Sequence, residues 1–102
     1  MRIFIKTEQF TQETLNLLPQ QRHKYLSEHQ LWVEGLRASG KKLSSGYLVD
    51  QGKNPGGGGL LIFEANSYVN AKSIVEKDPM ILAGLVKWEL QEWKRHFEQS
   101  IM

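Results

Sequence analysis

The chain has 102 residues and a mass of 11.8 kDa, which is the length of one compact domain with room for one core and one small pocket. Its 40% hydrophobic and 24% charged residues are typical of a globular protein, and the formal charge of +2, with basic and acidic residues intermixed, does not indicate a nucleic-acid partner. Cysteine is absent, which excludes disulfides, thiolate metal sites and a cysteine nucleophile. The apolar residues before Lys6 are too few for a signal peptide and no run approaches the length of a membrane span, so we expect a cytoplasmic protein without a membrane partner.

The first forty residues predict a strand followed by a long helix. Ile3 and Ile5 alternate with their neighbours, which is a short β pattern. A helical turn is expected from about Thr11, and residues 20–39 have the pattern of a helix that starts at Pro19 and is capped by Gly40. One face of this helix is apolar and aromatic, so we expect it to pack inward: Tyr25, His29, Trp32, Val33 and Leu36.

A hairpin is predicted next. Alternation with period two returns in the run KKLSSGYLVD, which indicates a strand with small residues at its middle. The segment QGKNPGGGG predicts a long glycine-rich connection, and the apolar run LLIFEA, residues 60–65, predicts the buried strand that follows it.

The last forty residues predict a second helix, a short turn and a final strand. Ser67 is placed to cap the helix, and Asp78 followed by Pro79 is typical of the start of a short helical turn that Gly84 ends. The final strand alternates through Val86, Trp88 and Leu90, and a charged tail that can form a helical turn follows it.

The order β, α, β, β, α, β predicts an α+β fold of the ferredoxin-like βαββαβ type, with a four-stranded antiparallel sheet and both helices on one face. The other face of the sheet is left uncovered, and Tyr47, Trp88 and Trp93 are candidates for it. A large apolar patch is unusual on a small monomer, so we expect a homodimer that forms through this open face.

The order and spacing of several residues resemble the pattern of the YCII-related (YciI-like) family over nearly the whole chain. The matching positions are His29, Gly40, Gly46, residues 56–59, the strand that ends at Ala65, and Asp78 with Pro79. The resemblance implies that residues 1–102 form a single YCII-like domain with the dimeric α+β barrel fold. It also implies a polar pair, here His29 and Asp78, in a pocket between helix and sheet.

The sequence departs from the family pattern at two positions. Leu26 stands where family members often have an arginine, and Tyr47 stands where they often have a proline. Arg22 and Lys24 are candidate replacements for the arginine.

His29 and Asp78 are the candidate catalytic residues. His29 lies on the inward face of its helix, where a partly desolvated imidazole beside a carboxylate can act as a general base; the alternative is a structural histidine bonded to a backbone carbonyl. Asp78 can orient His29 and stabilise its protonated form, or it can serve only as the cap before Pro79. Both possibilities stay open, and one residue could fill both roles.

A small organic molecule, anionic or aromatic, is the expected ligand, and the candidate ligand-binding residues are Trp32, Ser45, Gly46, Tyr47 and Met80. Hydroxyl groups on the second strand can donate hydrogen bonds to a substrate oxygen, and a glycine there allows a close approach; small residues that make room for a crossing helix are the alternative. The histidine spacing forms no metal set, so we expect no metal. The glycine run lacks the Gly-Lys-Ser/Thr of a phosphate loop, and we find no cofactor motif.

These observations favour a cofactor-independent enzyme of the elimination or isomerisation type, with His29 as acid and base and Asp78 as its partner. The alternative is a non-catalytic dimeric module that binds a small ligand or assists another protein. Stacking of RNA bases on the sheet aromatics is disfavoured because the RNP motifs are missing.

Overall fold

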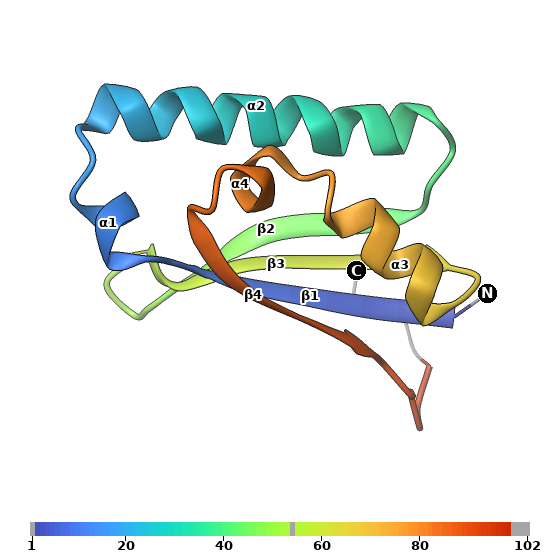
Figure 1. The fold of residues 1–102 in the computed structure, drawn as a ribbon. Helices are drawn as coiled ribbons and strands as arrows, with labels where there is room; N and C mark the ends of the chain where they lie inside the picture. Colours follow the sequence, from blue (N-terminus) through green and yellow to red (C-terminus); the bar gives the residue numbers. More distant parts are fainter. Residues whose placement is uncertain (1, 54, 99–102) are drawn as a thin grey trace.

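The computed structural model describes residues 2–53 and 55–98, which form a four-stranded antiparallel sheet with helices on one of its two faces (Figure 1). The strands lie in the order β2-β3-β1-β4 and are β1 (Arg2–Phe10), β2 (Leu43–Val49), β3 (Pro55–Ala65) and β4 (Val86–Glu92). The helices are α1 (Gln12–Leu15), α2 (Pro19–Ala38), α3 (Tyr68–Val75) and α4 (Pro79–Leu82). This is the predicted ferredoxin-like fold. No helix in the described ranges is long and apolar enough to cross a bilayer.

The helices begin and end where local sequence signals place them. The Ser67 hydroxyl accepts a hydrogen bond from the backbone N–H of Asn70, and the Asp78 carboxylate accepts one from Met80. Gly40 follows α2 with a φ of 94°, in the left-handed region that glycine adopts without strain. The caps predicted at these three positions are confirmed.

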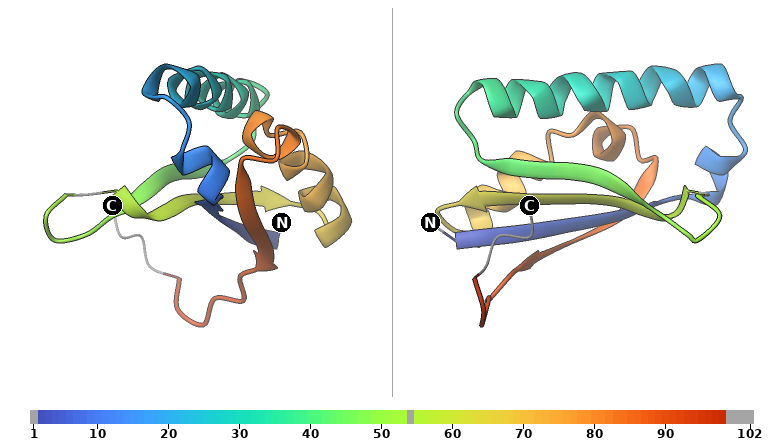
Figure 2. Two further views of the ribbon diagram at one scale, coloured as in Figure 1. Left: turned by 60° about the vertical axis from the view of Figure 1, so that its left-hand side comes forward. Right: turned by 180° about the vertical axis from the view of Figure 1, so that it is seen from behind.

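The core lies between the sheet and the shorter helices. Its buried members come from both central strands, β4 and α3: Phe4, Leu61, Phe63, Ala65, Ala71, Val75 and Leu90. α2 behaves differently, because none of its residues is fully buried and its main contribution to this cluster is the half-buried Trp32. Figures 1 and 2 show α2 as the helix farthest from the sheet, running above α4. Side chains on the inner face of α2 therefore remain within reach of solvent.

The strand register decides which residues belong to each face of the sheet. Trp88 lies opposite Glu8 on the face that the helices cover, and it packs against the core. Tyr47 lies opposite Gly59 and therefore on the same covered side. The prediction that Tyr47 and Trp88 face the open side was wrong, because alternation shows that a strand has two faces without showing which one the helices cover. Trp93 follows the end of β4, donates its N–H to the carbonyl of Ile3 and lies on the open side as predicted.

β3 begins earlier than the sequence predicts, because much of the glycine run belongs to the strand and not to the connection. Gly59 lies directly opposite Glu8, and a Cβ atom at Gly59 would come within 2.6 Å of Glu8 Oε1. Gly58 has a φ of 81°, and a Cβ there would overlap the carbonyl oxygen of Glu8. Glycine is needed here because β1 and β3 approach each other closely around Glu8.

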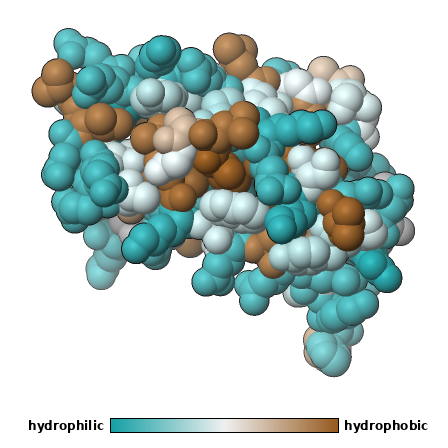
Figure 3. All heavy atoms as spheres, in the orientation of Figure 1, coloured by the Kyte–Doolittle hydropathy of each residue, from teal (hydrophilic) through white to brown (hydrophobic). Residues whose placement is uncertain are grey.

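The tail also differs from its prediction. Residues 93–98 contain no helical turn, and they leave the sheet on the side away from the helices (Figure 2). Hydrophobic side chains on the helix side gather in the middle of the view, below α2 and around α4, with hydrophilic ones around them (Figure 3).

Candidate active site

Asp78 is the centre of the candidate site. As the N-cap of α4 it is fully buried, and its Oδ1 accepts the backbone N–H of Met80 at 2.9 Å. The same carboxylate also accepts hydrogen bonds from side chains on α2 and β1. The two roles that the sequence left open for Asp78, cap and partner of His29, are therefore both present in its contacts.

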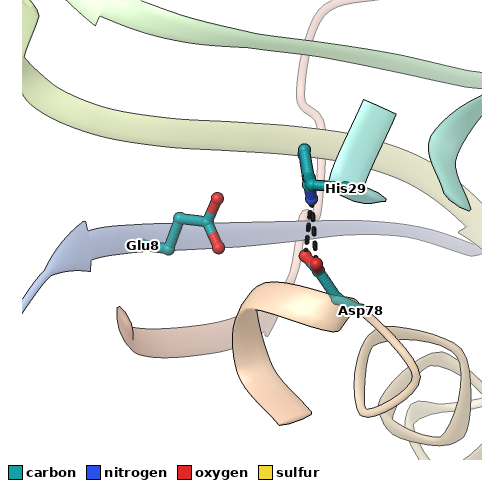
Figure 4. A group of neighbouring side chains, drawn as sticks. All are labelled: Glu8, His29 and Asp78. Carbon is teal, nitrogen blue, oxygen red and sulfur yellow. Dashed lines mark hydrogen bonds and ion pairs between the residues drawn. The ribbon is translucent and has the colours of Figure 1, made fainter. Parts of the chain in front are cut away.

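His29 approaches Asp78 from α2. Its Nδ1 lies 2.9 Å from Oδ1 and 3.0 Å from Oδ2 of Asp78 (Figure 4). With Asp78 ionised, Nδ1 carries the hydrogen and donates it, which leaves Nε2 as the unprotonated nitrogen. The side chain of His29 is 16% exposed, and Nε2 makes no hydrogen bond with the described part of the chain. This is the arrangement that a general base requires.

Trp32 follows His29 by one turn of α2 and forms an aromatic wall beside it. The two ring centroids are 5.8 Å apart, with an angle of 40° between the planes. The structure thus brings together His29, Asp78 and the predicted ligand residue Trp32.

Lys6 is a further member of the site that the sequence prediction missed. Its ammonium lies 2.9 Å from Asp78 Oδ2 and 3.0 Å from Glu8 Oε2, and its side chain is only 1% exposed. It also stands 5.9 Å from the centroid of the Trp32 ring, within the range of a cation–π contact. A buried ammonium is tolerated only when it is paired, and here two carboxylates pair it.

Electrostatics keep Asp78 ionised. Burial alone raises the pKa of Asp78, but hydrogen bonds from His29 and Lys6, together with their positive charges, outweigh this effect and hold the pKa below the ordinary value of 3.8. At neutral pH the carboxylate is therefore available to accept the Nδ1–H of His29.

Glu8, His29 and Asp78 are the described residues that could hold a metal ion, since each brings a ligand atom within 4.8 Å of the others. The Lys6 ammonium is bonded to both carboxylates of this group and already supplies a positive charge to them. We therefore assign the group no metal.

The other predicted ligand-binding residues lie apart from this pair. The Met80 side chain is buried, and only its backbone N–H reaches Asp78. Ser45 and Tyr47 are exposed on the covered side of β2, while Gly46, opposite Leu60, belongs to the open side. These three residues form no hydrogen bond with His29 or Asp78 within the described ranges, so their roles in binding stay predictions.

Two hollows in the described part of the surface lie near these elements, and their linings do not include His29 or Asp78. One of about 260 Å³ begins one turn of α2 before His29 and is lined by Leu17, Gln21, Lys24, Tyr25 and Leu85. One of about 140 Å³ follows β2 and is lined by Ser44, Ser45, Gly46, Tyr47, Leu48, Leu60 and Ile62.

Comparison with known proteins agrees with the fold. Residues 1–94 match the model of the YCII-related domain, so the chain belongs to the YCII-related family. A similar solved structure is that of 5-chloro-2-hydroxyhydroquinone dehydrochlorinase (TftG) from Burkholderia phenoliruptrix AC1100, in complex with 2,5-dihydroxybenzoquinone. The sequences are 28% identical, the TM-score is 0.71, and the match covers 90% of this chain and 93% of the other. No curated protein sequence matches the chain.

Proposed function

We propose that this protein is a small-molecule enzyme in which Nε2 of His29 takes a proton from the substrate while Asp78 holds the other ring nitrogen. The observation that carries the proposal is the bond from Nδ1 to a buried, ionised carboxylate, combined with an Nε2 that has no partner in the described chain. The His29 side chain is 16% exposed, so it is not closed off from a substrate.

The reaction class is elimination or isomerisation. Nε2 accepts a proton from an O–H or C–H group of the substrate, and the electron pair left behind forms a new double bond. In an elimination the leaving group departs with its bonding pair; in an isomerisation His29 returns the proton to a different atom. Asp78 stabilises the imidazolium that exists between the two steps.

The similar dehydrochlorinase supports a small oxygenated ring as the substrate class, because its complex holds 2,5-dihydroxybenzoquinone. In the present chain Trp32 offers an aromatic surface beside His29. Arg22 lies two turns before His29 on the same stripe of α2, and its buried Nε has no hydrogen-bond partner among the described residues. A guanidinium with an unused Nε–H favours an anionic oxygen on the substrate.

Turnover of ring compounds that carry a hydroxyl and a chloride leaving group tests the function, starting with 5-chloro-2-hydroxyhydroquinone and measuring released chloride. We expect turnover by the wild type and a loss of at least about 100-fold in His29→Asn, the usual effect of removing a general base. His23→Asn is the matched control, because His23 is exposed on the same helix.

Two outcomes overturn the proposal. Equal rates in His29→Asn and in the wild type would remove His29 from the chemistry. Binding of 2,5-dihydroxybenzoquinone without turnover of any chlorinated compound would favour the alternative, a non-catalytic binding or accessory module.

We also propose that two copies pair through the open face of the sheet. The centre of this face is apolar and is formed by Ile3, Ile5, Leu60 and Ile62. Leu48 and Trp93 stand beside it, and they are 48% and 41% exposed. An apolar sheet face is stabilised when a second layer covers it. A cytoplasmic location stays a prediction.

A further inference from the structure

Four ionisable side chains form one connected chain of contacts, from Glu8 through Lys6 and Asp78 to His29. The successive distances are 3.0, 2.9 and 2.9 Å. The side chains are 12%, 1%, 0% and 16% exposed in that order, so little water lies between them. Charges at such sites are screened less than charges on the surface, and each one acts on the others.

The charge of this cluster depends on the state of His29. Lys6 compensates one of the two carboxylates, so the cluster carries one net negative charge when the imidazole is neutral and none when it is protonated. Without Glu8, Lys6 and Asp78 would compensate each other, and a proton on His29 would add a positive charge with nothing to balance it. Glu8 thus favours proton uptake by His29 although the two residues form no hydrogen bond.

Lys6 acts on the geometry as well as on the charge. It binds Oδ2 of Asp78 while the N–H of Met80 binds Oδ1, which fixes the plane of the carboxylate so that both oxygens face Nδ1 of His29. Gly59 leaves the space that the Glu8 side chain needs beside Lys6.

We propose that Lys6 and Glu8 are positioning residues that set, in opposite directions, the pH range over which His29 accepts a proton. The inference rests on the proposed function of His29 as a base. Lys6 orients Asp78. Glu8 compensates the positive charge of Lys6, so that one negative charge remains near the imidazole.

The remaining groups around His29 do not reproduce this effect. On α2 itself the ionisable neighbours on the inner stripe are Tyr25 and, two turns away, Arg22. β2 offers Tyr47 on its covered side, while the covered residues of β3 and β4 nearest this level of the sheet are uncharged: Gly59, Leu61, Trp88 and Leu90. α4 contributes Asp78 alone.

A double-mutant cycle followed by NMR tests the inference without a substrate. The ring proton signal of His29, assigned by its loss in His29→Asn, is followed against pH in the wild type, Glu8→Gln, Lys6→Met and the double variant. We expect the pH of half-protonation to fall by about one unit in Glu8→Gln and to rise by about one unit in Lys6→Met, the size that a charge within 4–6 Å produces. The double variant should return close to the wild-type value, because it has the same net charge.

A purely structural role for the two residues predicts no such reversal of sign. Shifts in the same direction, or shifts no larger than in the control Glu64→Gln, would overturn the inference; Glu64 is a half-buried glutamate on the open face. Lys6→Met leaves two buried carboxylates without a cation, so its amide spectrum is checked for folding first. If it does not fold, the fall in Glu8→Gln against Glu64→Gln decides, since the glutamine side chain in Glu8→Gln keeps an oxygen that accepts from Lys6.

Failure of the proposed function gives a different pattern of results. Opposite shifts in a protein that turns over no ring compound would remove the enzyme proposal and leave the charge coupling intact. Turnover by the wild type, combined with variants in which the His29 signal does not shift, would remove the charge coupling and leave the enzyme proposal intact.

Discussion

Asp78 accepts hydrogen bonds from a backbone N–H, an imidazole and an ammonium, which come from α4, α2 and β1. A cap requires a short side chain with an oxygen at a helix start, and a partner for His29 requires an ionised oxygen in a buried place. The two requirements are compatible because each carboxylate oxygen has two lone pairs. Asparagine meets the first requirement and fails the second.

Substitution of Asp78 by Asn should therefore destabilise the protein by an amount that depends on pH. The folded-state pKa of Asp78 is depressed, so its stabilisation is fully present above the unfolded value of about 3.8 and is lost as the pH falls through the lower folded value. We expect Asp78→Asn to cost about 2 kcal/mol at pH 7, within the range for hydrogen bonds to charged groups, and progressively less below pH 4. Urea unfolding of both proteins at pH 7, 4 and 3 measures this difference.

Glu76→Gln provides the control, because Glu76 is an exposed acid two residues before Asp78. It should change the free energy of unfolding little at every pH. A cost of Asp78→Asn that stayed constant from pH 7 to pH 3 would contradict a depressed pKa.

At the residue scale, the pairing of His29 with Asp78 was expected from the resemblance to the YCII-related family, whereas Lys6 and Glu8 were not recognised. The local signals, an aromatic helix face for His29 and a following proline for Asp78, left a structural histidine and a simple cap open as alternatives. Lys6 lies in a strand whose apolar residues occupy both faces, and a lysine there is normally solvated. The available signal was the pair Lys6 and Glu8, two residues apart and opposite in charge, on the same face as Phe4.

At the scale of elements, the start of β3 is shaped by its partner strand. A glycine run after Asn-Pro has the composition of a loop, and the sequence contains nothing local that distinguishes it from one. The distinction arises from β1, which lies beside the run. Glu8 on β1 occupies the space that side chains at positions 58 and 59 would need. Contacts between residues fifty positions apart are not visible in local patterns, which is also why the face of Trp88 was misassigned.

Alanine substitutions along this hairpin should differ according to what each Cβ meets. Gly46→Ala has open space around it and should be nearly neutral. Gly59→Ala pushes against the flexible Glu8 side chain and should cost about 1 kcal/mol, the low end for overpacking. Gly58→Ala should cost about 3 kcal/mol, since it combines a positive φ with overlap on a backbone oxygen.

Thermal and urea unfolding of the three variants give the order directly. Equal destabilisation at positions 46, 58 and 59 would contradict the close approach of β1 and β3. Gly59→Ala has a second readout: because it displaces Glu8, the pH of half-protonation of His29 should move in the same direction as in Glu8→Gln.

The long helix α2 was the best predicted element, with boundaries within one residue of those observed. Its proline start and glycine end are local signals, and its aromatic stripe has the helical period. Its distance from the sheet was not predictable, because amphipathic spacing gives the direction of a face without giving what lies under it. α2 rests over α4, which is why His29 meets the cap of that short helix.

At the scale of the whole molecule, the two faces of the sheet have different roles. The covered face holds the core and the ionic cluster, and all described helices lie over it. The open face has an apolar centre on the two middle strands and polar residues on the β4 edge, namely Lys87, Glu89 and Gln91. An apolar centre with a polar rim is the usual composition of a protein–protein interface.

A charge placed at the centre of the open face should separate the proposed dimer. Ile62 lies on this face opposite Ile5, so Ile62→Lys puts an ammonium into the apolar centre of the proposed interface. We expect light scattering after size-exclusion chromatography to give twice the chain mass for the wild type and one chain mass for Ile62→Lys. Leu31→Lys, at a position that is 73% exposed on α2, should remain dimeric.

A wild type that runs at one chain mass at about 100 μM would remove the open-face dimer, and a dimer in both variants would place the interface on another surface. The ionic cluster lies on the other face, so the His29 signal in Ile62→Lys should titrate as in the wild type, and this separates loss of assembly from loss of the fold.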